Sequence, residues 1–165
     1  MRFEELQNAL STNLFTFADV CKHFSDESDQ DLRTQLYRFR QRGDLVSPKR
    51  GVYAFDLDSV NQFQLANLLY QPSYVSLESA LNYYGIIPGV PQQVTSVNPT
   101  QPKKFKTDGN VFVYYRVKKE LFWGYQKVTA VENGHRFKIA EKEKALLDYF
   151  YLRKKKIFPL SSVFV

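Results

Sequence analysis

Hydrophobic positions in the first part of the chain repeat at helical spacing. Residues 3–10 carry apolar side chains about one turn apart, and residues 13–15 interrupt the helical pattern. In residues 17–24 the apolar positions follow the i, i+3, i+4, i+7 order of a single helix face. Thr16 precedes this second segment and suits the N-cap position. The pattern predicts two short helices in quick succession.

A third and longer helix is predicted over residues 29–42. Leu32, Leu36 and Phe39 fall on one narrow stripe at about 100° per residue. Acidic residues occupy its first turn and arginines its last, as the helix dipole favours. Gly43 follows, at the position where a residue in the left-handed backbone conformation commonly ends a helix.

The opposite side of this third helix is cationic and contains no acid. Long hydrogen-bonding side chains of this kind contact phosphates and base edges in the DNA major groove. The residues on this side are Gln30, Arg33, Thr34, Tyr37, Arg38 and Gln41.

Two short β-type runs follow, at residues 45–47 and 52–55, and flank a turn containing Pro48 and Gly51. Lys49 and Arg50 lie at the tip of that turn. Helix, helix, cationic helix and basic-tipped hairpin is the order of a winged helix-turn-helix. In that arrangement the third helix enters the major groove and the wing lies against the backbone or minor groove. Because a fold does not determine function, a protein-binding winged helix is the alternative.

The remaining residues predict a mixed α/β domain with a small, mainly antiparallel sheet. Helices are expected at 59–69, at 76–84 with Ser76 and Ser79 capping its start, and at 140–152. A short strand is expected at residues 94–97 and a longer one at 111–117, with further strand candidates at 122–125, 128–131 and 136–139.

Several connecting segments also carry expectations. Residues 99–109 are predicted to form an exposed loop carrying Lys103, Lys104 and Lys106. A turn is expected at Asn133-Gly134. In the last helix, the residues expected to point inward are Ala145, Leu146, Tyr149 and Phe150. The basic run 153–156 is interpreted as a solvated helix end.

The distribution of charge along the chain indicates where a polyanionic partner would bind. The 165-residue chain has a formal net charge of +6. Residues 1–32 have two basic and seven acidic side chains, whereas residues 33–50 have six basic and one acidic. Residues 59–165 hold a further 15 basic and seven acidic side chains. The overall charge therefore conceals a strongly cationic helix–hairpin segment, which is the predicted DNA footprint.

Composition excludes several classes of protein. A single cysteine, Cys21, cannot form an intrachain disulfide or a multi-thiolate metal site. No run approaches the roughly 20 apolar residues of a membrane span, and the acidic start does not suit a secretory signal. The expected location is the cytoplasm. The domain boundaries are predicted as residues 1–58 and 59–165, in an α+β chain.

No catalytic chemistry is predicted. His23 and His135 belong to no ligand or triad pattern, and no Gly-x-Ser-x-Gly turn surrounds Ser76 or Ser79. The chain is expected not to be an enzyme and to need no cofactor or metal. A metal-dependent nuclease and single-strand binding by the aromatic strands are the less favoured alternatives, because alternating aromatics more often form a core.

Two blocks of the second half resemble a known family. Tyr74–Pro88 contains a Ser-x-x-Ser-Ala-Leu run followed by Gly-Ile-Ile-Pro, and Ala140–Asp148 contains Glu-Lys-Ala-Leu-x-Asp. With the winged-helix segments 43–46 and 50–53, these blocks resemble the AbiEi-type antitoxins of type IV toxin–antitoxin and phage abortive-infection systems. The resemblance spans about residues 1–153. Relatives usually continue further, so residues 157–165 are interpreted as the end of a shortened copy.

The resemblance implies a bifunctional regulator. The winged helix would repress its own operon by binding inverted repeats in the promoter, while the second domain would counteract a co-encoded toxin of nucleotidyltransferase fold, often without a stable complex. A stand-alone regulator without antitoxin activity is the alternative. By position, the implied DNA-binding residues are Arg33, Thr34, Tyr37, Arg38 and Gln41, with Lys49 and Arg50 in the wing. The two blocks themselves are interpreted as structural.

Overall fold

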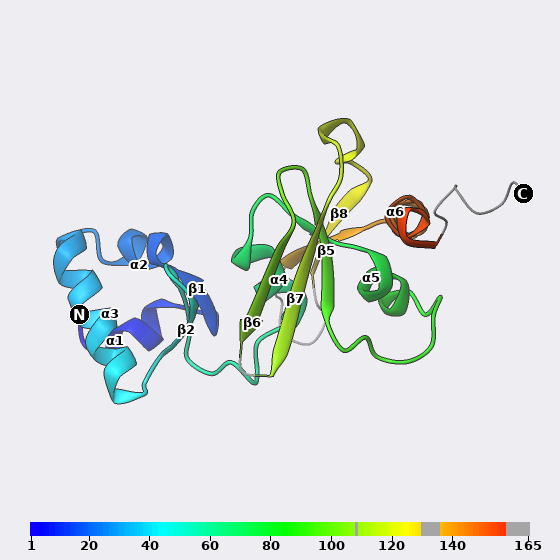
Figure 1. Cartoon of the computed structure of the whole chain (residues 1–165). Helices are drawn as coiled ribbons and strands as arrows, with labels where there is room; N and C mark the ends of the chain where they lie inside the picture. The colour runs from blue at the N-terminus through cyan, green and yellow to red at the C-terminus, as the bar shows by residue number, and fades with distance from the viewer. Residues whose placement is uncertain (108, 130–135, 158–165) are drawn as a thin grey trace, which may run out of the picture. The chain divides into compact units, whose positions relative to one another are not determined.

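A computed structural model describes residues 1–107, 109–129 and 136–157, with side chains up to Lys154. Within these residues the chain is mixed α+β, with six α-helices and two β-sheets. It divides into two compact units, the first spanning Met1–Asn61 and the second beginning at Gln62 (Figure 1). The predicted Asn133-Gly134 turn, His135 and residues 158–165 lie outside the described residues.

The first unit contains three helices and a small antiparallel sheet. The helices are α1 (Phe3–Ala9), α2 (Phe17–His23) and α3 (Asp29–Arg42), which confirms the three predicted helices. The strands are β1 (Leu14–Thr16), β2 (Val46–Lys49) and β3 (Val52–Ala54), in the order β1-β3-β2. The predicted hairpin is present, and the unpredicted β1 adds a third strand beside β3.

Caps and burial explain these helices. The Thr16 side chain accepts a hydrogen bond from the backbone of Asp19, and the Asp19 carboxylate accepts one in return from the backbone of Thr16. Ser28 caps α3, and Gly43 ends it with a φ of 82°. The stripe predicted for α3 is buried in the core of the unit. Core residues include Leu6, Phe15, Val20, Leu32, Leu36, Phe39 and Leu45.

The second unit is built on a six-stranded sheet in the order β6-β7-β5-β4-β9-β8. The strands are β4 (Tyr74–Val75), β5 (Val94–Asn98), β6 (Lys103–Thr107), β7 (Asn110–Arg116), β8 (Tyr125–Thr129) and β9 (Arg136–Ala140). Three neighbouring pairs are antiparallel, while β4/β9 and β5/β7 are parallel. The sheet is therefore mixed.

Helices cover both faces of this sheet. The helices are α4 (Gln62–Leu69), α5 (Leu77–Tyr83) and α6 (Lys142–Ile157), with a 3₁₀ turn at Lys119–Leu121. The Tyr114 hydroxyl donates to the Ala66 carbonyl of α4, while the neighbouring Tyr115 hydroxyl accepts from Arg153 of α6. Because successive strand residues point to opposite faces, α4 and α6 lie on opposite sides of β7 (Figure 1).

Two sequence predictions about strands are wrong. Residues 103–107, predicted as part of a loop, form the edge strand β6, whose lysines are exposed. Charged side chains are common on sheet edges because they discourage pairing with another chain. The strand predicted at 122–125 is instead the segment between the 3₁₀ turn and β8, which begins at Tyr125.

The inward face of α6 also differs from the prediction. Ala145 is buried, but Phe150 is 63% exposed, and Leu147 is exposed as well. Lys144 and Asp148 occupy the buried positions instead. The expected solvated end is also wrong for Arg153, whose guanidinium donates to Glu78 of α5 and to Tyr115.

Candidate nucleic-acid interface

The outward face of α3 carries all five residues predicted there for DNA contact. Arg33, Thr34, Tyr37, Arg38 and Gln41 are exposed, and Tyr37 has 57% of its surface open to solvent. Their positions follow from the helix itself, because burying Leu32, Leu36 and Phe39 directs the opposite side to solvent. The structure therefore brings these five side chains onto one accessible surface.

Most of these side chains have no partner that would restrain them. Within the described residues, Tyr37, Arg38 and Gln41 form no side-chain hydrogen bond or ion pair, so their polar groups are available to a ligand. Thr34 donates to the Gln30 carbonyl one turn earlier. The Arg33 guanidinium lies over the ring of Phe17, with its Cζ 3.8 Å from the ring centroid.

Arg40 belongs to the same surface and was missed by the sequence analysis. It is exposed in the last turn of α3, seven residues after Arg33 and three after Tyr37. That spacing places Arg40 beside Tyr37 and in line with Arg33 two turns away, so the periodicity alone could have identified it. Arg42, by contrast, is engaged: its guanidinium contacts the Asp44 carboxylate at 2.7 Å and lies over the Phe39 ring.

The hairpin supplies the two remaining predicted residues, which differ in exposure. Arg50 is exposed at the turn, whereas Lys49 is half-buried at the end of β2. The turn reverses through Gly51, whose φ of 82° favours glycine. The Gly51 carbonyl accepts a hydrogen bond of 2.9 Å from the backbone N–H of Phe17, so the hairpin tip is attached to the start of α2.

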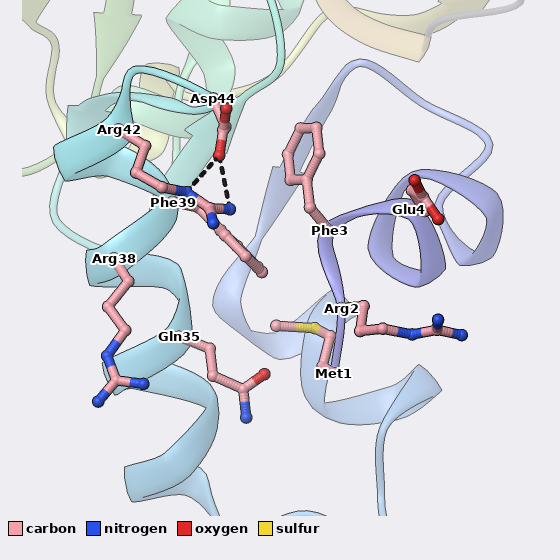
Figure 2. A pocket seen from close by; sticks show the side chains of 9 residues that line it. All are labelled: Met1, Arg2, Phe3, Glu4, Gln35, Arg38, Phe39, Arg42 and Asp44. Carbon is pink, nitrogen blue, oxygen red and sulfur yellow. Dashed lines mark hydrogen bonds and ion pairs between the residues drawn. The ribbon is translucent and has the colours of Figure 1, made fainter.

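A groove of about 920 Å³ borders α3 on the side facing the start of the chain (Figure 2). It is lined by residues 1–4, by Asp44 and by α3 side chains. Gln35 points toward Met1, whereas Arg38 points away from it (Figure 2). The Gln35 amide donates to Glu27, and among the described residues its Oε1 is buried without a hydrogen-bond partner. The lining of the groove also includes Glu4 and Asp44, so the groove is mixed in charge and is not an extension of the cationic surface.

The Cys21 thiol of the first unit is not activated as a nucleophile. Burial raises the pKa of the Cys21 thiol, and the nearby Asp29 raises it further. A thiol with a raised pKa is protonated at neutral pH and is a poor nucleophile. His23 is exposed at the end of α2.

The second unit contains a buried polar cluster around Asp148. This carboxylate accepts hydrogen bonds from the Tyr74 hydroxyl at 2.9 Å, from the Ser76 hydroxyl at 2.8 Å and from the Lys144 ammonium. Burial, together with the Asp148 carboxylate, raises the pKa of Tyr74 far above its ordinary value, so Tyr74 remains a donor. All four residues are buried, so the cluster is closed to a substrate.

The two serines expected to cap α5 have other roles. Ser76 occupies the N-cap position but makes no capping hydrogen bond with its side chain, which contacts Asp148 instead. Ser79 is buried, and its hydroxyl accepts from the Thr95 backbone and donates to the Gln93 carbonyl. These contacts attach α5 to the segment before β5 and to β5 itself. Both partners of Ser79 are distant in the sequence, so local sequence patterns do not predict this structural role.

The described residues also show neither a metal site nor a membrane-spanning helix. They contain no group of three or more His, Cys, Asp or Glu side chains placed to hold a metal ion. No described helix has both the length and the apolar character needed to cross a bilayer.

Comparison with protein-family models yields no match, and comparison with curated proteins finds no similar sequence.

Proposed function

We propose that this protein is a winged-helix DNA-binding regulator that acts as the autorepressor and antitoxin of a type IV toxin–antitoxin operon. The observation that carries the DNA-binding part is the exposed face of α3, whose Arg38 and Gln41 have no side-chain partner within the described residues. Such side chains form bidentate contacts with guanine and adenine in the major groove. A regulator of this kind acts in the cytoplasm on double-stranded DNA.

The order of elements in the first unit supports the winged-helix interpretation. Strand β1 lies between α1 and α2, and the β2–β3 hairpin follows α3 directly. The sheet order β1-β3-β2 puts the hairpin's second strand in the centre. In winged-helix proteins this arrangement presents the third helix to the major groove, with the hairpin beside it.

The antitoxin part rests on the resemblance of residues 74–88 and 140–148 to AbiEi-type proteins. In the second unit these two segments contact each other, because Asp148 accepts hydrogen bonds from Tyr74 and Ser76. A shared buried cluster supports treating them as parts of a single architecture. The implied functional partner is a nucleotidyltransferase-fold toxin, and the proposal requires no stable complex with it.

A mobility-shift titration of the full chain on its own upstream promoter tests the DNA-binding part. Binding to an inverted repeat requires two copies on one site. If each copy makes about four to six phosphate contacts, its contribution to the slope of log affinity against log salt is about −4 to −5. A matched duplex with the repeat scrambled should bind more weakly. An absent or salt-insensitive shift would overturn the DNA-binding function and favour a protein-interaction module.

Co-expression with an adjacent nucleotidyltransferase-like gene tests the antitoxin part. Full-length wild-type protein should restore growth. The double variant Arg38→Ala, Gln41→Ala should also restore it while losing repression, because the two functions are assigned to different units. Failure of the wild-type chain to restore growth would reduce the proposal to a stand-alone regulator.

A further inference from the structure

Phe17 contacts both cationic segments of the proposed interface. Its ring lies under the guanidinium of Arg33 from α3, at 3.8 Å from Cζ to the ring centroid. Its backbone N–H donates to the carbonyl of Gly51 in the hairpin turn, at 2.9 Å. A single residue at the start of α2 therefore connects an arginine of α3 to the tip of the hairpin.

The surroundings of Phe17 fix its position. The ring is half-buried and packs against the hydrophobic core of the first unit. The preceding residue, Thr16, pairs with Val52 in the β1–β3 ladder and also caps α2 with Asp19. Because strand pairing, capping and core packing all act here, Phe17 is a rigid support for the groups that contact it.

This support determines where the charge of Arg33 lies. One face of the guanidinium is covered by the ring, while Arg33 remains exposed overall and has no ion pair within the described residues. Its charge is thus held at the start of α2, next to the backbone that binds Gly51. The exposed Arg50 is the residue immediately before Gly51. A cation near the start of the recognition helix and a second one at the hairpin turn suit contacts with the phosphate backbone, which fix register without reading sequence.

We propose that Phe17 is a positioning residue that holds Arg33 beside the hairpin tip, so that Arg33 and Arg50 together bind the phosphate backbone of duplex DNA. This proposal rests on the proposed DNA-binding function. It divides the cationic surface into two parts: Arg33 and Arg50 bind phosphates, whereas Arg38 and Gln41 face the bases.

The first experiment measures Arg33→Ala by fluorescence anisotropy on two labelled duplexes, the promoter repeat and a mixed-sequence control, over a series of salt concentrations. Loss of one phosphate contact should reduce the steepness of the log–log salt dependence by about 0.9 for each bound copy. The ratio of affinities for the two duplexes should not change. Arg116→Ala removes the same charge from an exposed position of the second unit and should leave the slope unchanged. A fall in the affinity ratio for Arg33→Ala, or equal slope changes in both variants, would overturn the phosphate assignment.

The second experiment is a double-mutant cycle between Phe17 and Arg33. Phe17→Leu should weaken binding to both duplexes about two- to fivefold, the effect of an exposed cation–π contact. The same substitution should have no effect in the Arg33→Ala background, and Phe17→Tyr, which retains the ring, should bind like the wild type. Thermal unfolding of each variant measures any loss of folded protein.

Two results separate this proposal from the function on which it depends. Equal losses from Phe17→Leu with and without Arg33 would mean that Phe17 does not act through Arg33, and would overturn the positioning role. If Phe17→Leu does not fold, the Arg33→Ala arm still decides the phosphate assignment, because Arg33 is exposed. Absence of binding by the wild-type chain to either duplex would refute the DNA-binding function itself.

Discussion

Lys144 and Asp148, one turn apart on α6, form an ion pair that is almost withdrawn from solvent, with 5% and 3% of their side chains exposed. The Asp148 carboxylate also accepts hydrogen bonds from Tyr74 and Ser76. The Lys144 ammonium lies 5.1 Å from the centroid of the Trp123 ring. The buried charges of Lys144 and Asp148 are compensated only while all of these partners are present. Loss of any one partner should therefore reduce the stability of the second unit.

Asp148→Asn should strongly destabilise the second unit. The amide cannot neutralise Lys144, and breaking a buried pair by removing one partner costs about 3–5 kcal/mol. Urea denaturation of the full chain measures the change in the free energy of unfolding. Glu143→Gln alters an exposed acid of the same helix and should change it by less than about 0.5 kcal/mol. Similar effects for the two variants would contradict a structural role for the pair.

Gly124 and Gly85 provide a matched test of the packing around Lys144. Both have a positive φ, of 74° and 70°, so alanine at either position costs about 1–2 kcal/mol in backbone conformation. An added Cβ at Gly124 would lie 2.9 Å from Cγ of Lys144, whereas at Gly85 it would meet nothing within 4 Å. Gly124→Ala should therefore cost about 1–3 kcal/mol more, as in other overpacked sites. Equal unfolding midpoints for the two variants would show that Lys144 can move aside.

Asp19 should make the first unit more stable at neutral than at acidic pH. Burial, the largest single influence, raises its pKa, but hydrogen bonds from Thr16 and the nearby Lys22 together lower the pKa below its ordinary 3.8. A lowered pKa in the folded state contributes stability that is complete above the unfolded value and lost as the pH falls through the folded one. Asp19→Ala should lower the free energy of unfolding at neutral pH by about 1 kcal/mol.

Denaturation at a series of pH values checks this expectation. The difference between the wild type and Asp19→Ala should shrink as the pH falls below 3.8. Asp26→Ala removes an exposed acid nearby and should change the free energy of unfolding by less than about 0.5 kcal/mol. A constant difference across the acidic range would contradict the capping role of the carboxylate.

On the proposed DNA interface, Arg38→Ala and Gln41→Ala should erode discrimination between sequences. Each bidentate contact with a base is worth about 1–3 kcal/mol of discrimination against the wrong base pair. Arg50→Ala should instead weaken binding to every duplex by a similar factor. Competition assays with promoter and scrambled duplexes measure both effects. Loss of discrimination with Arg50→Ala would contradict the assignment of the hairpin to the backbone.

The sequence predicted the helices of the first unit well because their determinants are local. Stripe spacing, the Thr16 and Ser28 caps and the Gly43 stop all act within one or two turns. The exposed face of α3 follows directly from its buried stripe. Strand β1 was missed because three residues carry too little periodicity, and its pairing with β3 joins distant parts of the chain.

The errors in the second unit have a different origin. Residues 103–107 contain three lysines, a composition typical of an exposed loop. Hydrogen bonding to β7 nevertheless makes this segment an edge strand. In α6, hydrophobicity predicts that Phe150 is buried and that Lys144 and Asp148 are exposed, which is the reverse of the observed burial. The partners that allow this charged pair to be buried, Tyr74 and Ser76, lie in another segment, so local periodicity could not identify it. The contact between Phe17 and Arg33 was missed for the same reason.

The bond between Asp148 and Tyr74 joins positions 74 residues apart, which has a kinetic consequence. Closing so long a loop costs entropy before the contact forms, so this contact is expected late in folding. Removing an interaction that is absent from the transition state accelerates unfolding and leaves the folding rate nearly unchanged. We therefore expect loss of the cluster around Asp148 to shorten the lifetime of the folded second unit without slowing its folding.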